Sequence, residues 1–218
     1  MTSKILILSL CILISSFILY SPGQAEQKSD IFIPWDYLTL PRDMAKYQNV
    51  LKRIFFNKQY SILTMLYLPV SKNEWIVKVE NINSEVMEAV VIESKKRIWD
   101  TLLQSGFSDE IIEKTNWDIS ISKKEINKKL VNKIFKIWKT NLEGVYPLND
   151  SLKMLDTDIL YFSCWENKIG YYSGMNYSVA PHSNAAKMVQ IGLKLKEYVL
   201  SNEKKKSKIL SELELLAQ

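Results

Sequence analysis

Hydrophobic residues at alternate positions predict three strands in the first half of the chain. The predicted strands are Tyr60–Pro69, Glu74–Ile82 and Met87–Ser94. In these segments apolar and polar side chains alternate, or β-branched residues cluster, as is typical of strands. Short polar segments separate the three strands, and short connections favour pairing between neighbours. We therefore expect an antiparallel meander.

A second group of strands is predicted near the C-terminal end. The alternation of apolar and polar residues runs from Leu160 to Trp165 and resumes from Ile169 to Tyr177, after a polar turn. Asn167 in that turn tolerates the left-handed backbone that a short hairpin connection requires. Together, the meander and the hairpin predict an α+β domain with an antiparallel sheet of about five strands.

Apolar residues three and four positions apart predict helices around these strands. The expected helices before the hairpin are Pro41–Phe56, Lys95–Gln104, Ser108–Lys114 and a fourth over residues 122–142. Gly106 is expected to end the second of them as a C-terminal cap. The run Ser122-Lys123-Lys124-Glu125 matches a capping box, so we expect the fourth helix to begin there.

A long helical region is predicted after Pro181, with Ser183 as its N-cap. It begins with one apolar stripe, made of Ala185, Met188, Val189, Gly192, Leu195 and Val199. A second stripe lies in an amphipathic helical tail over residues 201–218, made of Ile209, Leu210, Leu213 and Leu216. The second stripe either packs on its own domain or meets a protein partner.

Glycines mark a place of close approach in the hairpin. Gly170 and Gly174 lie on the same face of one strand, so that face lacks a Cβ atom at these two positions. Such a groove receives a closely packed helix or a ligand. Gly192 lies in the apolar stripe of the following helix, so we expect that helix to cover the hairpin groove.

The first 25 residues have the layout of a secretory signal peptide. Lys4 supplies a basic start, residues 5–20 are apolar, and Gly23-Gln24-Ala25 forms a small-x-small cleavage site. A spanning helix needs about 20 apolar residues, so the run is short for an anchor. We expect cleavage near Ala25, export to the periplasm or beyond, and one domain over residues 26–218. If the segment is retained, it anchors the chain in the membrane.

Composition narrows the chemistry that this domain can perform. The chain has 29 basic and 24 acidic residues, a mild excess without the concentrated basic face of a nucleic-acid-binding protein. One histidine and one cysteine outside the signal peptide are too few for a zinc, copper or iron–sulfur site. Phosphate-binding loops and calcium-loop spacings are also missing from the sequence. We predict no cofactor and no metal.

Cys164 and His182 raise the possibility of a thiol nucleophile with its base. Cys164 shares an apolar strand face, where a thiol is inert, so we predict a buried cysteine and a surface histidine. A Ser–His pair stays open but has no nucleophile-elbow motif; its serines would be Ser163, Ser173 or Ser178.

Aromatic residues around the hairpin predict a binding surface. Aromatic rings can stack against sugars, although some of these rings are expected to face the core. The candidate binding residues are Trp165, Tyr171, Tyr172, Gly174, Tyr177 and His182.

The region 156–199 resembles a small uncharacterised family of exported proteobacterial proteins. The resemblance is carried by Asp156, Tyr161-Phe162-Ser163, Gly170, Gly174, Tyr177-Ser178, Pro181, Leu195 and Tyr198. Where this chain has Tyr161, the family has a histidine. The resemblance implies an exported bacterial domain and no particular activity.

These patterns predict an exported binding protein rather than an enzyme. Its partner is expected to be a protein of the envelope, as for an immunity-type inhibitor of an envelope toxin or an accessory protein, or a component of the cell wall. The alternative is a small envelope hydrolase acting on cell-wall, ester or amide substrates. Its chemistry would use a serine, His182 or the carboxylates Asp156, Asp158 and Glu166.

Overall fold

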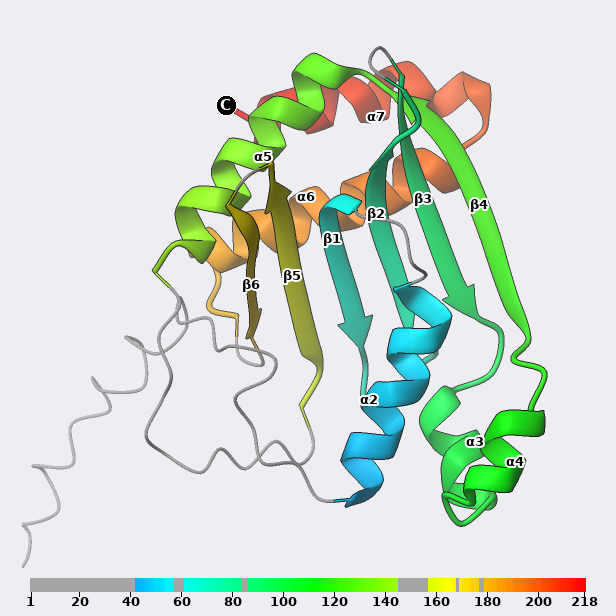
Figure 1. Ribbon diagram of the computed structural model, residues 1–218. Helices are drawn as coiled ribbons and strands as arrows, with labels where there is room; N and C mark the ends of the chain where they lie inside the picture. Colours follow the sequence, from blue (N-terminus) through cyan, green and yellow to red (C-terminus); the bar gives the residue numbers. More distant parts are fainter. Residues whose placement is uncertain (1–41, 57–60, 84–85, 145–156, 168, 177–178) are drawn as a thin grey trace, which may run out of the picture.

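The computed structural model has three layers, with one antiparallel sheet between two groups of helices (Figure 1). The structure describes residues 42–56, 61–83, 86–144, 157–167, 169–176 and 179–218. The predicted signal peptide lies outside these residues. None of the helices in these ranges has the length and apolar character needed to cross a membrane.

The sheet contains six strands in the order β4-β3-β2-β1-β5-β6, and each strand is antiparallel to its neighbours. The strands are β1 (Ser61–Leu68), β2 (Trp75–Asn81), β3 (Met87–Ser94), β4 (Ile119–Ile126), β5 (Ile159–Glu166) and β6 (Gly170–Asn176). The α+β class, the meander β1–β2–β3 and the hairpin β5–β6 are therefore confirmed. In the hairpin connection the left-handed backbone belongs to Gly170, with φ of 108°, and not to Asn167.

Strand β4 was not predicted, because its residues had been assigned to a helix start. Ser122 lies opposite Val91 of β3 and Glu125 lies opposite Glu88, so the capping-box prediction is wrong. Helix α5 (Lys128–Leu142) begins after the strand. Its N-cap is Asn127, whose side chain accepts a hydrogen bond of 2.7 Å from the backbone N–H of Lys129. Residues 122–125 pair their backbone N–H and C=O groups with strand β3. This pairing outweighs the local sequence signal for a helix start.

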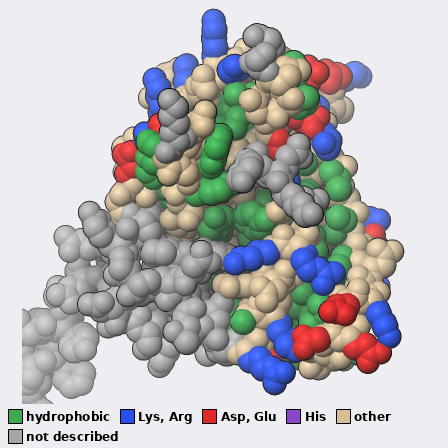
Figure 2. Space-filling view, viewed as in Figure 1, with side chains coloured by type: hydrophobic (Ala, Val, Ile, Leu, Met, Phe, Trp, Pro, Cys, Tyr) green, Lys and Arg blue, Asp and Glu red, His purple; other side chains and the backbone are tan. Residues whose placement is uncertain are grey.

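Three helices cover one face of the sheet. They are α2 (Arg42–Phe55), α3 (Ile98–Gln104) and α4 (Asp109–Lys114), and all three predictions are confirmed to within a few residues. Their apolar sides enter one core cluster with Leu66, Ile76 and Ile92 of the sheet. Their outer surfaces carry Lys, Arg, Asp and Glu side chains (Figure 2).

A buried carboxylate ties these helices to the sheet. Glu74 is fully buried, and its Oε2 accepts from the N–H of Ile98 at 2.8 Å and from Ser94 Oγ at 3.1 Å. Its Oε1 accepts from the N–H of Trp99 at 3.2 Å and from the Tyr47 hydroxyl at 2.9 Å. Burial is the main cause that raises the pKa of Tyr47, and the negative charge of Glu74 is the second. Glu74 therefore caps α3 from a distant part of the chain.

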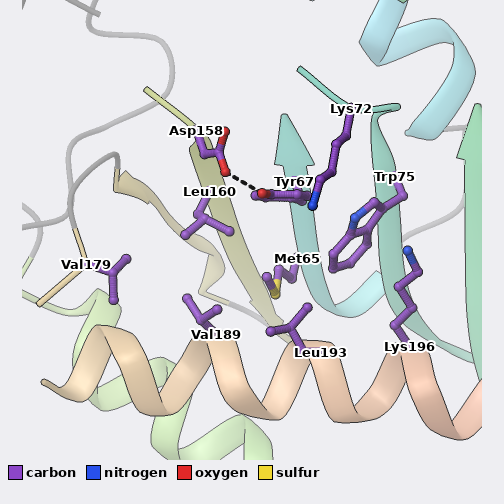
Figure 3. Close-up of a pocket in the computed structure, with 10 residues that line it drawn as sticks. All are labelled: Met65, Tyr67, Lys72, Trp75, Asp158, Leu160, Val179, Val189, Leu193 and Lys196. Carbon is purple, nitrogen blue, oxygen red and sulfur yellow. Dashed lines mark hydrogen bonds between the residues drawn. The ribbon is translucent and has the colours of Figure 1, made fainter. Parts of the chain in front are cut away.

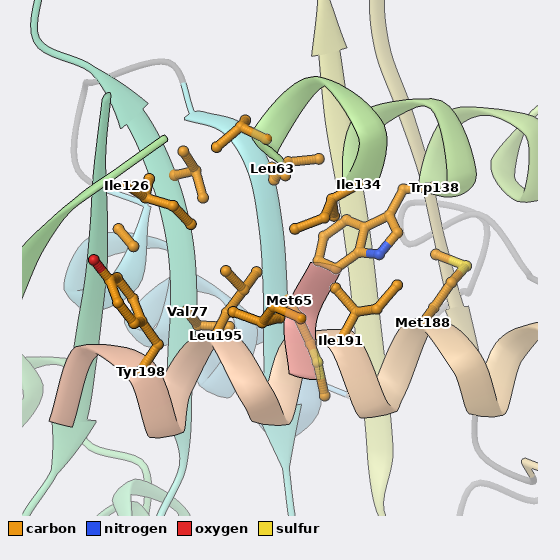
Figure 4. Close-up of a cluster of buried hydrophobic side chains, with 14 of the residues drawn as sticks. Leu63, Met65, Val77, Ile126, Ile134, Trp138, Met188, Ile191, Leu195 and Tyr198 are labelled. Atoms are coloured by element: carbon orange, nitrogen blue, oxygen red, sulfur yellow. The ribbon is translucent and has the colours of Figure 1, made fainter. Parts of the chain in front are cut away.

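The other face carries α5, α6 (Asn184–Leu200) and α7 (Glu203–Leu216) (Figures 1 and 4). Trp138 of α5 packs edge-on against Phe162 of β5, with ring centroids 5.3 Å apart. The predicted N-cap of α6 is confirmed, because Ser183 Oγ accepts from the N–H of Ala186 at 3.0 Å.

Helix α6 approaches the sheet closely at Gly192. A Cβ atom at this position would lie 1.9 Å from the Sδ of Met65 in β1. The predicted close approach of Gly192 is therefore confirmed, but the strand beneath it is β1. The helix packed on the hairpin strands β5 and β6 is α5, so the expected contact of Gly192 with the hairpin glycines is wrong.

Candidate binding surfaces on helix α6

The predicted thiol and histidine lie in different environments. Cys164 is fully buried as expected, and burial raises the pKa of its thiol to about 12. His182 is exposed, just before α6, with a left-handed backbone (φ of 67°). Neither side chain makes a hydrogen bond to another described residue. At neutral pH the Cys164 thiol stays protonated and therefore is a poor nucleophile.

The predicted aromatic surface is divided between the two faces of the sheet. Trp165 and Tyr171 lie opposite each other in the β5–β6 ladder, on the face that carries α2. Tyr172 and Gly174 point to the other face, where α5 packs. Tyr177 lies outside the described residues. The predicted residues therefore do not form one site.

On the α5 side, polar hairpin residues form an ion pair and a hydrogen bond with one another and with α5. Lys139 Nζ lies 2.8 Å from Glu166 Oε2, and the Tyr172 hydroxyl donates to the same oxygen at 3.1 Å. The hydrogen bond from Lys139 lowers the pKa of Glu166. Burial, followed by the hydrogen bond to Glu166, raises the pKa of Tyr172. These contacts join α5 to the hairpin, so Glu166 is engaged structurally.

The C-terminal apolar stripe packs largely inside the domain. Ile209 and Leu213 are 2% and 0% exposed, in the same core cluster as α6. Leu210 and Leu216 are partly buried against that cluster. The leucine of α7 that is most open to solvent is Leu215, which is 66% exposed.

A shallow apolar hollow of about 460 Å³ lies between α6 and α7. We call it the α6–α7 surface; it is lined by Gln190, Leu193, Lys194, Glu197, Glu212, Leu215 and Leu216. Leu193 is 48% exposed, so both Leu193 and Leu215 present apolar side chains to solvent. Lys194 Nζ lies 2.7 Å from Glu197 and 2.6 Å from Glu212. The charged groups at this surface therefore neutralise one another.

A second hollow, of about 550 Å³, lies between α6 and the sheet (Figure 3). We call it the α6 pocket; it is lined by Met65, Tyr67, Lys72, Trp75, Asp158, Leu160, Val179, Val189, Leu193 and Lys196. Leu193 lines both hollows, so the two apolar surfaces adjoin on α6.

Asp158 and Tyr67 form a closed pair at the rim of the α6 pocket. The Tyr67 hydroxyl donates a short hydrogen bond to Asp158 Oδ2, and the N–H of Val70 donates to Oδ1 at 2.9 Å. Burial and the hydrogen bond to Asp158 raise the pKa of Tyr67 to about 12. Tyr67 is therefore a neutral phenol at physiological pH, and both oxygens of Asp158 already accept hydrogen bonds.

The two lysines of the α6 pocket differ in their contacts. Lys196 Nζ lies 2.6 Å from Glu93 and 4.2 Å from the centroid of the Trp75 ring. Lys72 is exposed, and no ion pair or hydrogen bond joins it to another residue in the described part of the chain. Lys72 is thus the pocket-lining charge without a counter-ion there.

Comparison of the chain with protein-family models, with curated proteins and with solved structures found no match. Within the described residues there is also no group of three His, Cys, Asp or Glu side chains placed to hold a metal ion. The fold and the two hollows define an α+β domain with two apolar hollows along α6. Function is therefore inferred from these surfaces.

The sequence prediction missed both hollows. The residues of the α6 pocket come from β1, β2, β5, α6 and the connections between them, so no short motif connects them. Leu193 did carry a signal, because it is an apolar residue outside the buried stripe of α6. A leucine on the solvent side of an amphipathic helix is a candidate contact residue.

Proposed function

We propose that this chain is an exported binding protein that acts by contact with a protein partner of the bacterial envelope. The observation that carries the proposal is the α6–α7 surface, where Leu193 and Leu215 are 48% and 66% exposed beside an apolar hollow. Contiguous exposed apolar side chains rimmed by polar ones mark interaction sites on protein surfaces. An immunity-type inhibitor or an envelope accessory protein would act in this way.

The charges around the α6–α7 surface indicate what drives binding. Lys194 is already paired with Glu197 and Glu212, and Lys208 lies 3.9 Å from Glu212. A partner does not need to bring compensating charges, so burial of apolar area is the main source of affinity. Binding should therefore change little with ionic strength, unlike an electrostatically steered complex.

Export is a second part of the proposal and rests on the sequence. The basic start, the apolar run and the small-x-small site favour a leader that is removed near Ala25. The resemblance of residues 156–199 to exported proteobacterial proteins agrees with this destination. A periplasmic location would bring the α6–α7 surface into contact with envelope proteins.

One observation favours a second candidate, recognition of cell-wall glycan. Trp165 and Tyr171 face the same side of the β5–β6 hairpin, and Tyr171 is 52% exposed. Hydrophobic side chains also line a hollow above α2 on this face (Figure 2). Neighbouring aromatic rings of this kind can stack on sugars. The hydrolase alternative has no comparable support, because Cys164 is buried and Glu166 is engaged by Lys139.

Affinity capture with matched surface variants tests the protein-partner proposal. The double variant Leu193→Asp/Leu215→Asp should lose an envelope protein that the wild-type chain retains at both low and high salt. The double variant Leu103→Asp/Ile121→Asp is the control, because these side chains are 60% and 53% exposed but lie on the opposite side of the sheet from α6. Its capture should equal that of the wild type.

Two outcomes would overturn the protein-partner proposal. In the first, the α6 variant captures the same proteins as the wild type. In the second, the chain sediments with purified sacculi and is released by muropeptides. The second outcome would favour the glycan candidate, and Tyr171→Ala should then abolish sedimentation.

A further inference from the structure

We propose that the α6 pocket binds a small amphipathic carboxylate, with its apolar chain inside the pocket and its carboxylate at Lys72. This ligand is distinct from the protein partner proposed for the α6–α7 surface. The proposal rests on three features of the pocket: its size, its apolar wall and the arrangement of its charges.

The size and the wall of the pocket suit an aliphatic chain. At about 550 Å³ the hollow falls in the range of small-molecule sites, roughly 300–1,000 Å³. Its floor is apolar, and Figure 3 shows the side chains of Met65, Leu160, Val189 and Leu193 directed into the space between the sheet and α6. Such a wall binds by removing apolar surface from water and offers no hydrogen bonds to a polar ligand body.

The ring of Trp75 closes one side of the pocket. It is 6% exposed and packs at a tilt against Tyr67, with centroids 5.4 Å apart. Lys196 lies over the same ring and is neutralised by Glu93. Trp75 and Lys196 therefore hold each other in place and leave an aromatic wall of fixed orientation.

The charges at the rim select the charge of the ligand. Asp158 also lines the pocket, but hydrogen bonds from the Tyr67 hydroxyl and from the N–H of Val70 hold its two oxygens in place. Lys72 has no counter-ion among the described residues, and it is exposed at the mouth. A carboxylate placed at Lys72 therefore gains an ion pair, whereas a cation at the same position meets a like charge.

The charged contact should add selectivity rather than most of the affinity. An exposed ion pair contributes about 0.2–1 kcal/mol, which corresponds to a preference of about 1.4- to fivefold. The apolar chain supplies the remainder, so a neutral ligand of the same length should still bind. A ligand series that differs only in its head group can separate these two contributions.

Calorimetric titration of the protein expressed from the full sequence tests the proposal with three probes of equal chain length. The probes are decanoate and decyltrimethylammonium, each below its micelle-forming concentration, and decanol below its solubility limit. Decanoate should bind about 1.4- to fivefold more tightly than decanol, and the cation should bind most weakly. In methyl NMR spectra, decanoate should shift Leu160, Val179, Val189 and Leu193, which line the pocket.

Two variants and a control assign the effect to the pocket. Lys72→Gln should make decanoate and decanol equal, whereas Lys204→Gln removes an exposed lysine of α7 and should change neither. Val189→Trp should fill the pocket and prevent binding of both probes, with unchanged far-UV circular dichroism as a check of folding.

The proposal is overturned by equal affinity for decanoate and decanol in the wild-type protein, by a lack of decanoate binding, or by methyl shifts confined to Leu103 and Ile121. Because the titration uses the protein alone, each of these results leaves the protein-partner proposal standing. Loss of that partner in the capture experiment would likewise leave the pocket proposal standing.

Discussion

The two faces of the sheet use polar residues in opposite ways. On the face that carries α2, α3 and α4, ionisable groups are buried: Glu74 is 0% exposed, and Lys78 and Glu80 are 5% and 4% exposed. Lys78 Nζ lies 2.6 Å from Glu80 Oε1. On the face that carries α5, α6 and α7, the buried cluster is apolar, and charged residues lie at its edges.

We interpret this difference as one between a structural face and the face that carries the proposed binding surfaces. A buried charge requires defined partners, and the loss of one partner lowers the free energy of unfolding. The polar contacts of the α2 side therefore favour one arrangement of its elements. The α6 side instead has apolar area left over after its core has formed, on Leu193 and Leu215 and in the α6 pocket. We infer that stability depends most on the polar contacts of the first face and binding on the second.

The largest expected effect is on stability, at Glu74. Glu74→Ala leaves two backbone N–H groups and the hydroxyl of Tyr47 without their acceptor, whereas Ser94 Oγ keeps the backbone carbonyl of residue 74, 3.0 Å away. An unsatisfied buried donor costs about 1–3 kcal/mol, so we expect a loss of about 3–5 kcal/mol in the free energy of unfolding, measured by urea denaturation. The control Glu110→Ala removes a carboxylate that is 75% exposed, and it should cost less than about 0.5 kcal/mol.

A small loss of unfolding free energy in Glu74→Ala would contradict the proposed difference between the two faces. If the variant lost less than about 1 kcal/mol, the hydrogen bonds of Glu74 would contribute no more than ordinary ones. The α2 face would then owe its arrangement to its apolar cluster alone.

A smaller effect on stability is expected on the opposite face, at Gly192. Gly192→Val places side-chain atoms where Met65 Sδ now lies, so it should cost about 1–3 kcal/mol through overpacking. Thermal unfolding should show the loss, and adding Met65→Ala should recover part of it. Gly144→Val is the control, because a Cβ atom there would meet nothing within 4 Å. Equal effects at the two glycines would exclude a special contact at Gly192.

The parts of the fold that were predicted correctly depend on local patterns. Alternation identified β1, β2, β3, β5 and β6, because one-sided burial of a strand follows directly from its period of two. Helical spacing and capping residues identified α2 and the start of α6 at Ser183. The burial of Cys164 followed from the same alternation.

The parts that were missed depend on distant contacts. Residues 122–125 match a capping box, yet pairing with β3 decides their conformation. Glu74 reads as a polar residue at the start of a strand, whereas its role as the cap of α3 appears only when Ile98 lies beside it. The α6 pocket joins side chains from distant segments. Such features have no signature in a window of a few residues.

Site-specific photo-crosslinking in the host cell tests most directly whether α6 carries the binding face. A photoreactive amino acid would replace Leu215 or Leu193 on α6–α7 and, as controls, Leu103 or Ile121, all of which are exposed. We predict adducts of one envelope protein from positions 215 and 193 and none from positions 103 and 121. Adducts from the control positions alone, or equal adducts from all four, would contradict a binding surface on helix α6.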